Sequence, residues 1–311
     1  MKIIYSLNLK IDVFGGIDIG SNAVRLLIAH VVSANDKLVA IRKVSLVRVP
    51  IRLGSDVFHD QIISDNNKSR LIEAMKSYAL LMRLHKVSLY RAAATSAMRE
   101  SKNGGAIVDE IYQTSGIQVN IIDGMVEADI LASMEISVAV SPLKTYLYID
   151  VGGGSTELSV IKRGVKLASQ SFRLGTLRLG KSQEGEKEWL KVKKWVTENT
   201  KNLTRVHAMG SGGSINTVFS QSRKKEGKPL TYEHLKNYYD KITDMSYEDR
   251  VVQLGLKPDR ADVIEPALKI YLNAMKWGRA VDIFVPKIGL ADGIVKSIHL
   301  GTLEGYPVPQ P

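Results

Sequence analysis

Two short segments of this sequence place an aspartate just before a glycine-bearing turn, a combination suited to binding phosphate. The first, residues 149–158, has the sequence IDVGGGSTEL and lies between two apolar runs, so we expect a strand, a tight turn and a strand. Three successive glycines let the backbone approach a ligand closely and direct its N–H groups at an anion. The carboxylates of Asp150 and Glu157, on either side of the turn, could hold a cation against that anion.

The second segment, residues 17–26, has the sequence IDIGSNAVRL and repeats the order of isoleucine, aspartate, apolar residue and glycine. A strand-like run, residues 26–29, again follows the turn. Two further glycine turns, at 210–213 and 289–293, also come after strand-like runs. The repetition predicts two related half-molecules that face one cleft.

Hydrophobic periodicity predicts the elements that would position these turns. We expect the first half to contain three strands followed by alternating helices and strands, at residues 13–19, 24–31, 38–49, 65–85, 89–94, 105–114, 119–122 and 127–138. The second half repeats three strands, a helix and a strand, at residues 145–151, 157–162, 165–173, 184–200 and 206–209. A helix opened by residues 214–217, a helix at 267–275, a strand at 283–285 and a helix at 294–299 complete it.

The composition is that of a soluble globular protein, with 44% hydrophobic and 24% charged residues among 311, enough for one large or two ordinary domains. No apolar run approaches the roughly 18 residues of a membrane span, and the N-terminus lacks the features of a signal peptide. We therefore expect no membrane partner. The absence of cysteine excludes disulfides and fits a reducing cytoplasm.

The net charge of +11 favours an anionic partner: nucleic acid, an acidic surface or a polyphosphate. The basic residues recur in short groups, among them 42–43, 162–163, 193–194 and 223–225. The sequence shows neither a recognition helix nor the aromatic-interleaved pattern of single-strand binders. Nucleic acid is therefore not expected as a partner.

Several common catalytic motifs are absent. The sequence contains no GxxxxGK[ST] loop, no GxGxxG after a strand and no HExxH. Its six histidines lie far apart, so transition-metal ligation has little support. A hard cation such as Mg²⁺, held by carboxylate and phosphate oxygens, fits these residue types better.

Eight motifs together give the chain a specific resemblance. They are IDIGSNAVRLLI, ATSAMRES, IIDGMVEA, IDVGGGSTEL, FRLGTLRL, GSGGSINT, RADVIEPAL and GLADGIV. With them, the span from about residue 15 to 300 resembles the exopolyphosphatase/guanosine pentaphosphate phosphohydrolase (Ppx/GppA) family of the actin-like ATPase superfamily.

The resemblance implies an α/β fold of two actin-like (ribonuclease H-like) domains, each with a mixed sheet flanked by helices, and an active site in the cleft between them. Domain I would span residues 1–125 and domain II residues 126–296, with about 297–311 packing back on domain I. Dimers are common for this fold, so a homodimer is one expected assembly.

The resemblance also implies hydrolysis at a terminal phosphoryl group of inorganic polyphosphate, guanosine pentaphosphate or both. Glu127 aligns with the family's catalytic glutamate and would act as general base on the attacking water. Asp150 and Glu157, the other two expected catalytic residues, would hold Mg²⁺, or another divalent cation, directly or through water and help to position the nucleophile. Asp18 would do similar work from the facing loop.

The phosphate oxygens would be bound by backbone N–H groups and fixed positive charges. Arg260 is the less specific member of this set, because it could equally form an ion pair with Asp259 or Asp262. The expected phosphate-binding residues are Asp18, Gly20, Ser21, Asn22, Arg25, Arg99, Gly152, Gly153, Gly154, Ser155, Gly212, Gly213 and Arg260.

The segment around the expected base departs from the family pattern. The family commonly has an acid where Val126 stands and an arginine where Asp129 stands, a change that could raise the pKa of Glu127 or alter substrate contacts. These altered surroundings of Glu127 leave open a non-catalytic sensor that binds polyphosphate or a guanosine alarmone. An actin-like kinase or ATPase that uses the same loops is the other alternative to hydrolysis.

Overall fold

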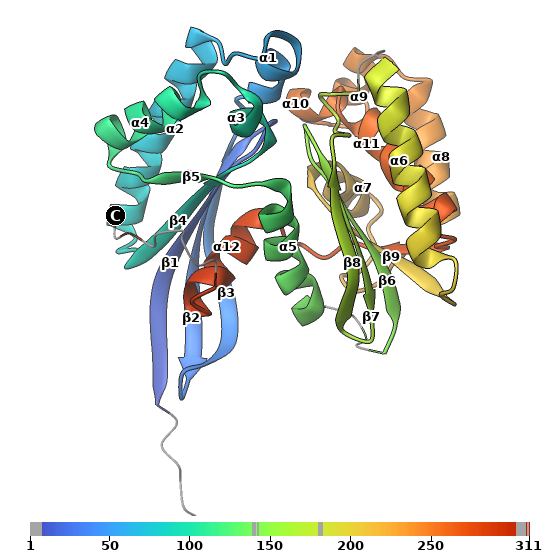
Figure 1. Ribbon diagram of the computed structural model, residues 1–311, viewed down its shortest axis with the longest axis horizontal. Helices are drawn as coiled ribbons and strands as arrows, with labels where there is room; N and C mark the ends of the chain where they lie inside the picture. Colours follow the sequence, from blue (N-terminus) through green and yellow to red (C-terminus); the bar gives the residue numbers. More distant parts are fainter. Residues whose placement is uncertain (1–7, 139–140, 142, 180–182, 303–308, 310) are drawn as a thin grey trace, which may run out of the picture. The chain divides into compact units, whose positions relative to one another are not determined.

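The computed structural model describes the chain except residues 1–7, 139–140, 142, 180–182, 303–308 and 310 (Figure 1). The chain divides into two compact units. Unit 1 comprises residues 1–53, 60–122 and 290–311, and unit 2 comprises residues 54–59 and 123–289. The boundaries expected from the sequence lie after residues 125 and 296. Part of the segment expected to pack back on domain I, residues 303–308 and 310, lies outside the described residues.

Unit 1 is built on a five-stranded mixed sheet in the order β3-β2-β1-β4-β5. The first three strands form an antiparallel meander, whereas β4 and β5 run parallel to β1. The strands are β1 (Leu9–Ile19), β2 (Val24–Ala34), β3 (Lys37–Val49), β4 (Leu89–Ala94) and β5 (Val119–Ile121). The helices are α2 (Asp65–Leu84), α3 (Ser96–Glu100), α4 (Gly104–Ser115) and α12 (Leu290–His299), and α1 (Leu53–Asp60) is shared between the units.

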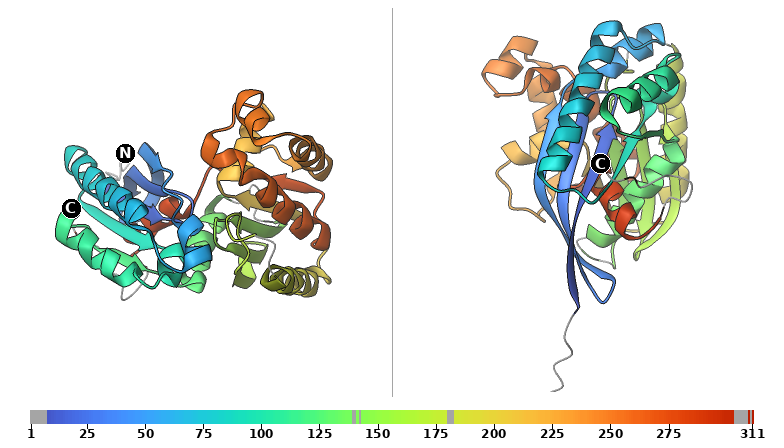
Figure 2. Two further views of the ribbon diagram at one scale, coloured as in Figure 1. Left: turned by 90° about the horizontal axis from the view of Figure 1, so that it is seen from above. Right: turned by 90° about the vertical axis from the view of Figure 1, so that its left-hand side faces the viewer.

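Two helices cover opposite faces of this sheet (Figure 2). Adjacent glycines of β1 show the arrangement, because successive residues of a strand face opposite sides. A Cβ at Gly15 would lie 3.1 Å from Sδ of Met82 in α2, and a Cβ at Gly16 would lie 2.6 Å from the backbone oxygen of Ala291 in α12. Helix α12, distant in sequence, is thus an integral layer of unit 1.

Unit 2 repeats this plan with a six-stranded sheet in the order β10-β11-β9-β6-β7-β8. Strands β6, β7 and β8 form the antiparallel meander, and β9 and β11 continue parallel to β6. The strands are β6 (Thr145–Val151), β7 (Thr156–Lys162), β8 (Val165–Phe172), β9 (Val206–Ser211), β10 (Leu230–Thr231) and β11 (Asp282–Phe284). The helices are α5 (Gly124–Val138), α6 (Gln183–Thr200), α7 (Gly213–Gln221), α8 (Tyr232–Thr243), α9 (Tyr247–Val252), α10 (Pro258–Ala261) and α11 (Ile264–Trp277).

The two faces of the unit 2 sheet are covered by different helices. Leu147, Ile149 and Leu158 join one buried cluster with residues of α6, α7, α8 and α11. None of the α5 residues whose side chains the structure describes belongs to that cluster, and the helix packs on β7 and β8 from the other face (Figure 1). Because side chains alternate along a strand, Asp150 and Glu157 project on the α5 face.

Most of the predicted elements are present with small shifts in their ends. Strand β1 begins at Leu9 rather than Val13, because it pairs with β2 as far as Leu9 opposite Ala34. Helix α5 begins at Gly124 rather than Glu127, and α12 begins at Leu290 rather than Ile294. In the part of the chain that the structure describes, no helix combines the length and apolar character needed to cross a bilayer.

Candidate active site

The β6–β7 hairpin of unit 2 ends in a four-residue turn that presents the three glycines. Asp150 lies opposite Glu157 and Val151 opposite Thr156, so Gly152 to Ser155 form the turn. The backbone N–H of Gly152 donates to the carbonyl of Ser155 at 3.0 Å and closes it. The expected strand-turn-strand arrangement is therefore present.

The carbonyl groups of this turn are bound from one side by the segment that follows β8. The backbone N–H groups of Thr176 and Leu177 donate to the carbonyls of Gly152 and Gly153 at 3.0 and 2.8 Å. Nε of Arg178 donates to the carbonyl of Gly154 at 2.8 Å.

These contacts orient the turn's backbone donors. In a trans peptide the C=O and the following N–H point in opposite directions. The N–H groups of Gly153, Gly154 and Ser155 therefore point away from the 176–178 segment, and such consecutive N–H groups form an anion-binding concavity.

Gly175 allows this segment to lie directly against the turn. A Cβ at Gly175 would fall 2.4 Å from the carbonyl oxygen of Gly153, a backbone atom that cannot move aside alone. We expect Gly175→Ala to distort the turn, lower the unfolding free energy by about 1–3 kcal/mol and raise KM for a phosphate substrate. Thermal melting and steady-state phosphate release measure both effects.

Gly105→Ala is the matched control, since a Cβ there meets nothing within 4 Å. It should leave KM unchanged and the melting temperature unchanged or slightly higher, because alanine favours a helix more than glycine does. A Gly175→Ala protein that melts and binds like the wild type would show that the close approach is unimportant.

The two carboxylates beside the turn face each other directly across the β6–β7 ladder. Glu157 is 2% exposed, and its Oε1 accepts a hydrogen bond from Oγ of Ser171 on β8 at 2.8 Å. Like charges directly opposite on a sheet repel each other, and a bound cation would offset that repulsion.

The donor set fits Mg²⁺. Among the described residues, no group of three or more histidine or acidic side chains is placed to bind a metal ion. Mg²⁺ does not require such a cage, because it is usually held by one or two protein carboxylates together with substrate phosphates and water. Asp150 and Glu157 supply such a pair.

A second glycine turn of unit 2 lies next to Asp150. Ser211, the last residue of β9, is in register with Asp150 of β6. Gly212 follows with a φ of 117°, and a Cβ there would lie 3.3 Å from Oδ1 of Asp150. The buried hydroxyl of Tyr271 donates to the carbonyl of Ser211. Burial, and next the charge of Asp150, raise the pKa of Tyr271, which keeps this hydroxyl protonated as a donor.

Arg260 lies over the N-terminus of α7. A Cβ at Gly213 would overlap its guanidinium at 2.1 to 2.3 Å, so the guanidinium rests on the glycine. Its Nε is 4.0 Å from Oδ2 of Asp259, the limit of an ion pair. A helix N-terminus and a guanidinium are both positive, and their juxtaposition favours an anion between or beside them.

Glu127 lies in the first turn of α5. Oδ1 of Asp123 accepts the N–H groups of Met125 and Val126 at 2.8 and 2.9 Å and caps the helix. Glu127 is 8% exposed, on the helix that packs against β7 and β8. The helix thus covers the sheet face on which Asp150 and Glu157 project.

Asp129 points toward a different partner. Its carboxylate forms an ion pair with Lys166 of β8, and both groups are partly exposed. Asp129, which departs from the family pattern, lies two residues along the helix from Glu127. Its negative charge is offset locally by Lys166 of β8.

The β1–β2 hairpin of unit 1 has the same geometry as the β6–β7 hairpin. The N–H of Gly20 donates to the carbonyl of Ala23 at 3.2 Å, and Asp18 lies opposite Arg25. Nη1 of Arg25 is 2.5 Å from Oδ2 of Asp18. Arg25 thus stands where Glu157 stands in unit 2, and its charge already compensates Asp18. The metal role expected for Asp18 stays a prediction.

The other expected phosphate residues of unit 1 surround this turn. Oγ of Ser21 lies 2.9 Å from Oγ of Ser96, and the N–H of Thr95 donates to the carbonyl of Ile19 at 3.1 Å. Asn22 is buried in the turn. Nη1 of Arg99 donates to the carbonyl of Ile122 at 2.6 Å, which fixes the arginine at the end of α3.

A family model matches most of the chain. Residues 30–301 match the model described as the Ppx/GppA phosphatase family. The chain belongs to the Ppx/GppA phosphatase family. This confirms the family that the sequence motifs predicted.

Relatives in the Ppx/GppA family include curated proteins of different lengths. The chain is 27% identical over 270 residues to the "Bifunctional 3-dehydroquinate synthase/phosphatase" of Fusobacterium nucleatum, with 80% of this chain and 41% of that protein aligned. It is 21% identical over 304 residues to the "Putative exopolyphosphatase" of Haemophilus influenzae, with 93% and 90% aligned. It is 25% identical over 164 residues to the "Guanosine-5'-triphosphate,3'-diphosphate pyrophosphatase" of Pseudoalteromonas translucida, with 53% and 32% aligned. The chain thus spans less than half of the first relative.

Solved structures of Ppx/GppA proteins share the fold. The crystal structure of the Aquifex aeolicus family member has a TM-score of 0.75 at 23% identity and covers 95% of this chain and 100% of its own. An exopolyphosphatase structure from Cytophaga hutchinsonii has a TM-score of 0.81 at 20% identity, with 94% and 99% covered. The predicted α/β fold of two actin-like domains with mixed sheets and flanking helices is confirmed.

Three residues that support the Ppx/GppA loops were missed as site residues. Gly175 lies in the FRLGTLRL motif, and a glycine between Arg173 and Arg178 after a strand could have suggested a close backbone approach. Ser171 and Tyr271 have no sequence signal, because their partners Glu157 and Ser211 are reached through sheet register and helix packing.

Proposed function

We propose that this protein is a Mg²⁺-dependent phosphohydrolase that releases terminal orthophosphate from inorganic polyphosphate, guanosine pentaphosphate or both. The observation that carries the proposal is the β6–β7 turn, where three backbone N–H groups point away from the 176–178 segment beside two opposed carboxylates. The names of two relatives, a putative exopolyphosphatase and a guanosine-5'-triphosphate,3'-diphosphate pyrophosphatase, support both substrate classes.

Glu127 acts as the general base in this proposal. Its carboxylate takes a proton from water as the water oxygen attacks the terminal phosphorus, and the bridging P–O bond breaks. The electron pair of that bond stays on the shortened chain, and orthophosphate leaves. Glu127 lies in the first turn of α5, where the positive end of the helix dipole favours negative charge.

The phosphate oxygens are bound by backbone N–H groups and arginines. Gly153, Gly154 and Ser155 supply the donors in unit 2, and Arg260 with the α7 N-terminus supplies a second positive site. Gly20, Ser21, Asn22, Arg25 and Arg99 are the proposed contacts from unit 1. When bound at Asp150 and Glu157, Mg²⁺ supplies positive charge to the phosphoryl oxygens. Preorganised donors stabilise the charge that spreads over these oxygens in the transition state.

The purified protein should release phosphate from tripolyphosphate, long-chain polyphosphate or guanosine pentaphosphate in the presence of Mg²⁺, and EDTA should abolish that release. Comparing the three substrates ranks the two substrate classes. ATP serves as the comparison for a kinase or ATPase, and tighter binding of ATP than of polyphosphate would favour that alternative. Binding of polyphosphate in Mg²⁺ without any release would favour the sensor.

We also infer that the protein acts in the cytoplasm, because a chain without cysteine suits a reducing compartment. A homodimer remains a prediction from the fold, and sedimentation of the purified protein measures it.

A further inference from the structure

One exposed segment of unit 2 carries a concentration of positive charge that the proposed chemistry does not use. Residues 223–228 have the sequence RKKEGK and connect α7 to β10. All six are exposed, and four basic side chains stand against one acidic side chain. Residues 223–225 form one of the short basic groups of the sequence, and neither the resemblance nor the proposed function gives them a role.

This segment has a defined backbone. The N–H of Lys228 donates to the carbonyl of Lys225 at 3.1 Å, and Gly227 supplies the positive φ of 79° that the turn requires. The N–H of Lys224 donates to Oγ of Ser222 at 3.3 Å, and its Nζ donates to the carbonyl of Pro229 at 2.9 Å. The basic side chains are therefore displayed from an ordered loop.

Sheet topology places this loop at the same edge as the phosphate turn. Strands β6, β9 and β11 are parallel, so their C-terminal ends share one edge, where β6 leads into Gly152. Strand β10 is antiparallel to β11 and therefore starts at that edge, with Leu230 opposite Ile283. The loop that enters β10 thus lies three strands from β6, or about 14 Å at the usual strand spacing.

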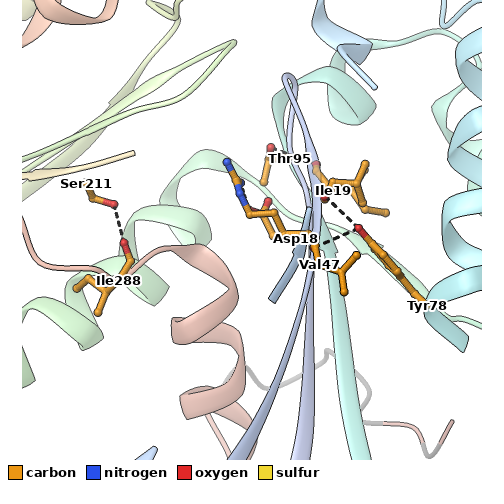
Figure 3. Close-up of polar contacts among 9 residues, drawn as sticks. Asp18, Ile19, Val47, Tyr78, Thr95, Ser211 and Ile288 are labelled. Carbon is orange, nitrogen blue, oxygen red and sulfur yellow. Dashed lines mark hydrogen bonds and ion pairs between the residues drawn. The ribbon is translucent and has the colours of Figure 1, made fainter. Parts of the chain in front are cut away.

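Two contacts connect the loop to the site across this edge. Nζ of Lys287 lies 3.5 Å from Oε2 of Glu226 in the loop. The next residue, Ile288, accepts a hydrogen bond through its carbonyl from Oγ of Ser211 at 3.3 Å (Figure 3). Ser211 is in register with Asp150. Residues 287–288 therefore contact both the loop and the last residue of β9, and Lys287 adds a fifth basic side chain beside the loop.

We infer that residues 223–228 with Lys287 form a polyanion-binding subsite that holds phosphates beyond the one being hydrolysed. The inference rests on the proposed function. The ligand chemistry is a phosphate-rich extension of the substrate, which a long polyphosphate chain and the 3′-diphosphate of guanosine pentaphosphate both offer. Exposed ion contacts are individually weak, but several along one polyanion add up through the release of its counterions.

The triple variant Arg223→Gln, Lys225→Gln and Lys228→Gln tests the subsite. We expect KM for long-chain polyphosphate to rise about tenfold, since three modest ion contacts are lost together. KM for tripolyphosphate and kcat for both substrates should stay within twofold, and the dependence of KM on salt concentration should become shallower. Guanosine pentaphosphate is the second arm: a matching rise in its KM assigns the loop to the 3′-diphosphate as well, and an unchanged KM restricts it to the polyphosphate chain.

The control removes the same number of charges from the exposed face of unit 2 around α6, as Lys187→Gln, Lys193→Gln and Lys201→Gln. It should leave all KM values unchanged. If both triple variants raise KM for long chains equally, net charge and not the loop is responsible, and the inference is overturned. An unchanged KM in the loop variant also overturns it. Failure of the proposed function would look different, because the wild type would then release no phosphate from any substrate.

Discussion

Replacing Asp150 by asparagine is expected to lower phosphate release by about 10²–10³-fold, as the loss of one preorganised electrostatic contact to a transition state typically does. Asp150 faces Glu157 across the β6–β7 ladder and lies beside both glycine turns of unit 2. The substitution keeps the shape of the side chain and removes one of the two charges proposed to hold Mg²⁺. The Mg²⁺ concentration required for half-maximal rate should rise along with the loss of rate.

The stability of this variant separates its chemical effect from a folding defect. Removing one of two opposed carboxylates relieves their repulsion, so the melting temperature should stay unchanged or rise. Asp240→Asn, in the exposed ion pair with Lys236 on α8, is the control and should keep full activity. An Asp150→Asn protein with wild-type rate and Mg²⁺ dependence would remove Asp150 from the proposed cation site.

Glu127→Gln is expected to lower kcat by about 10²–10⁴-fold, the usual contribution of a general base. KM and melting should change little, because glutamine keeps the size of a side chain that is only 8% exposed. The variant should also lose the fall in rate that protonation of the base causes at low pH. Rate measurements across pH for both proteins check this expectation.

Asp129→Asn is the control on the same helix. Its carboxylate pairs with Lys166 at a partly exposed position, so the substitution should leave kcat and its pH profile intact. A large shift of the pH dependence of the rate in Asp129→Asn would show that the charge at position 129 affects the titration of the base despite the ion pair with Lys166. A fully active Glu127→Gln protein would show that another group accepts the proton.

The sequence by itself determined the local parts of the fold. Short apolar runs around Ile149 and Leu158, separated by glycines, specify a hairpin, since a strand-like run and the turn residues that end it act over a few positions. The buried face of α2, from Leu71 to Met82, is specified in the same way by helical periodicity. The motifs were also sufficient to identify the family, which the match over residues 30–301 confirms.

Only the tertiary structure decided which groups meet over long separations. Asp18 and Asp150 look equivalent in sequence, yet register places Arg25 opposite one and Glu157 opposite the other, so only the second hairpin presents paired carboxylates. The approach of Gly175 to Gly153 and the union of α12 with β1 likewise depend on packing between distant segments. Local sequence patterns indicate which side of a strand is buried. Which residues contact that side depends on how all segments of the unit pack together at high density.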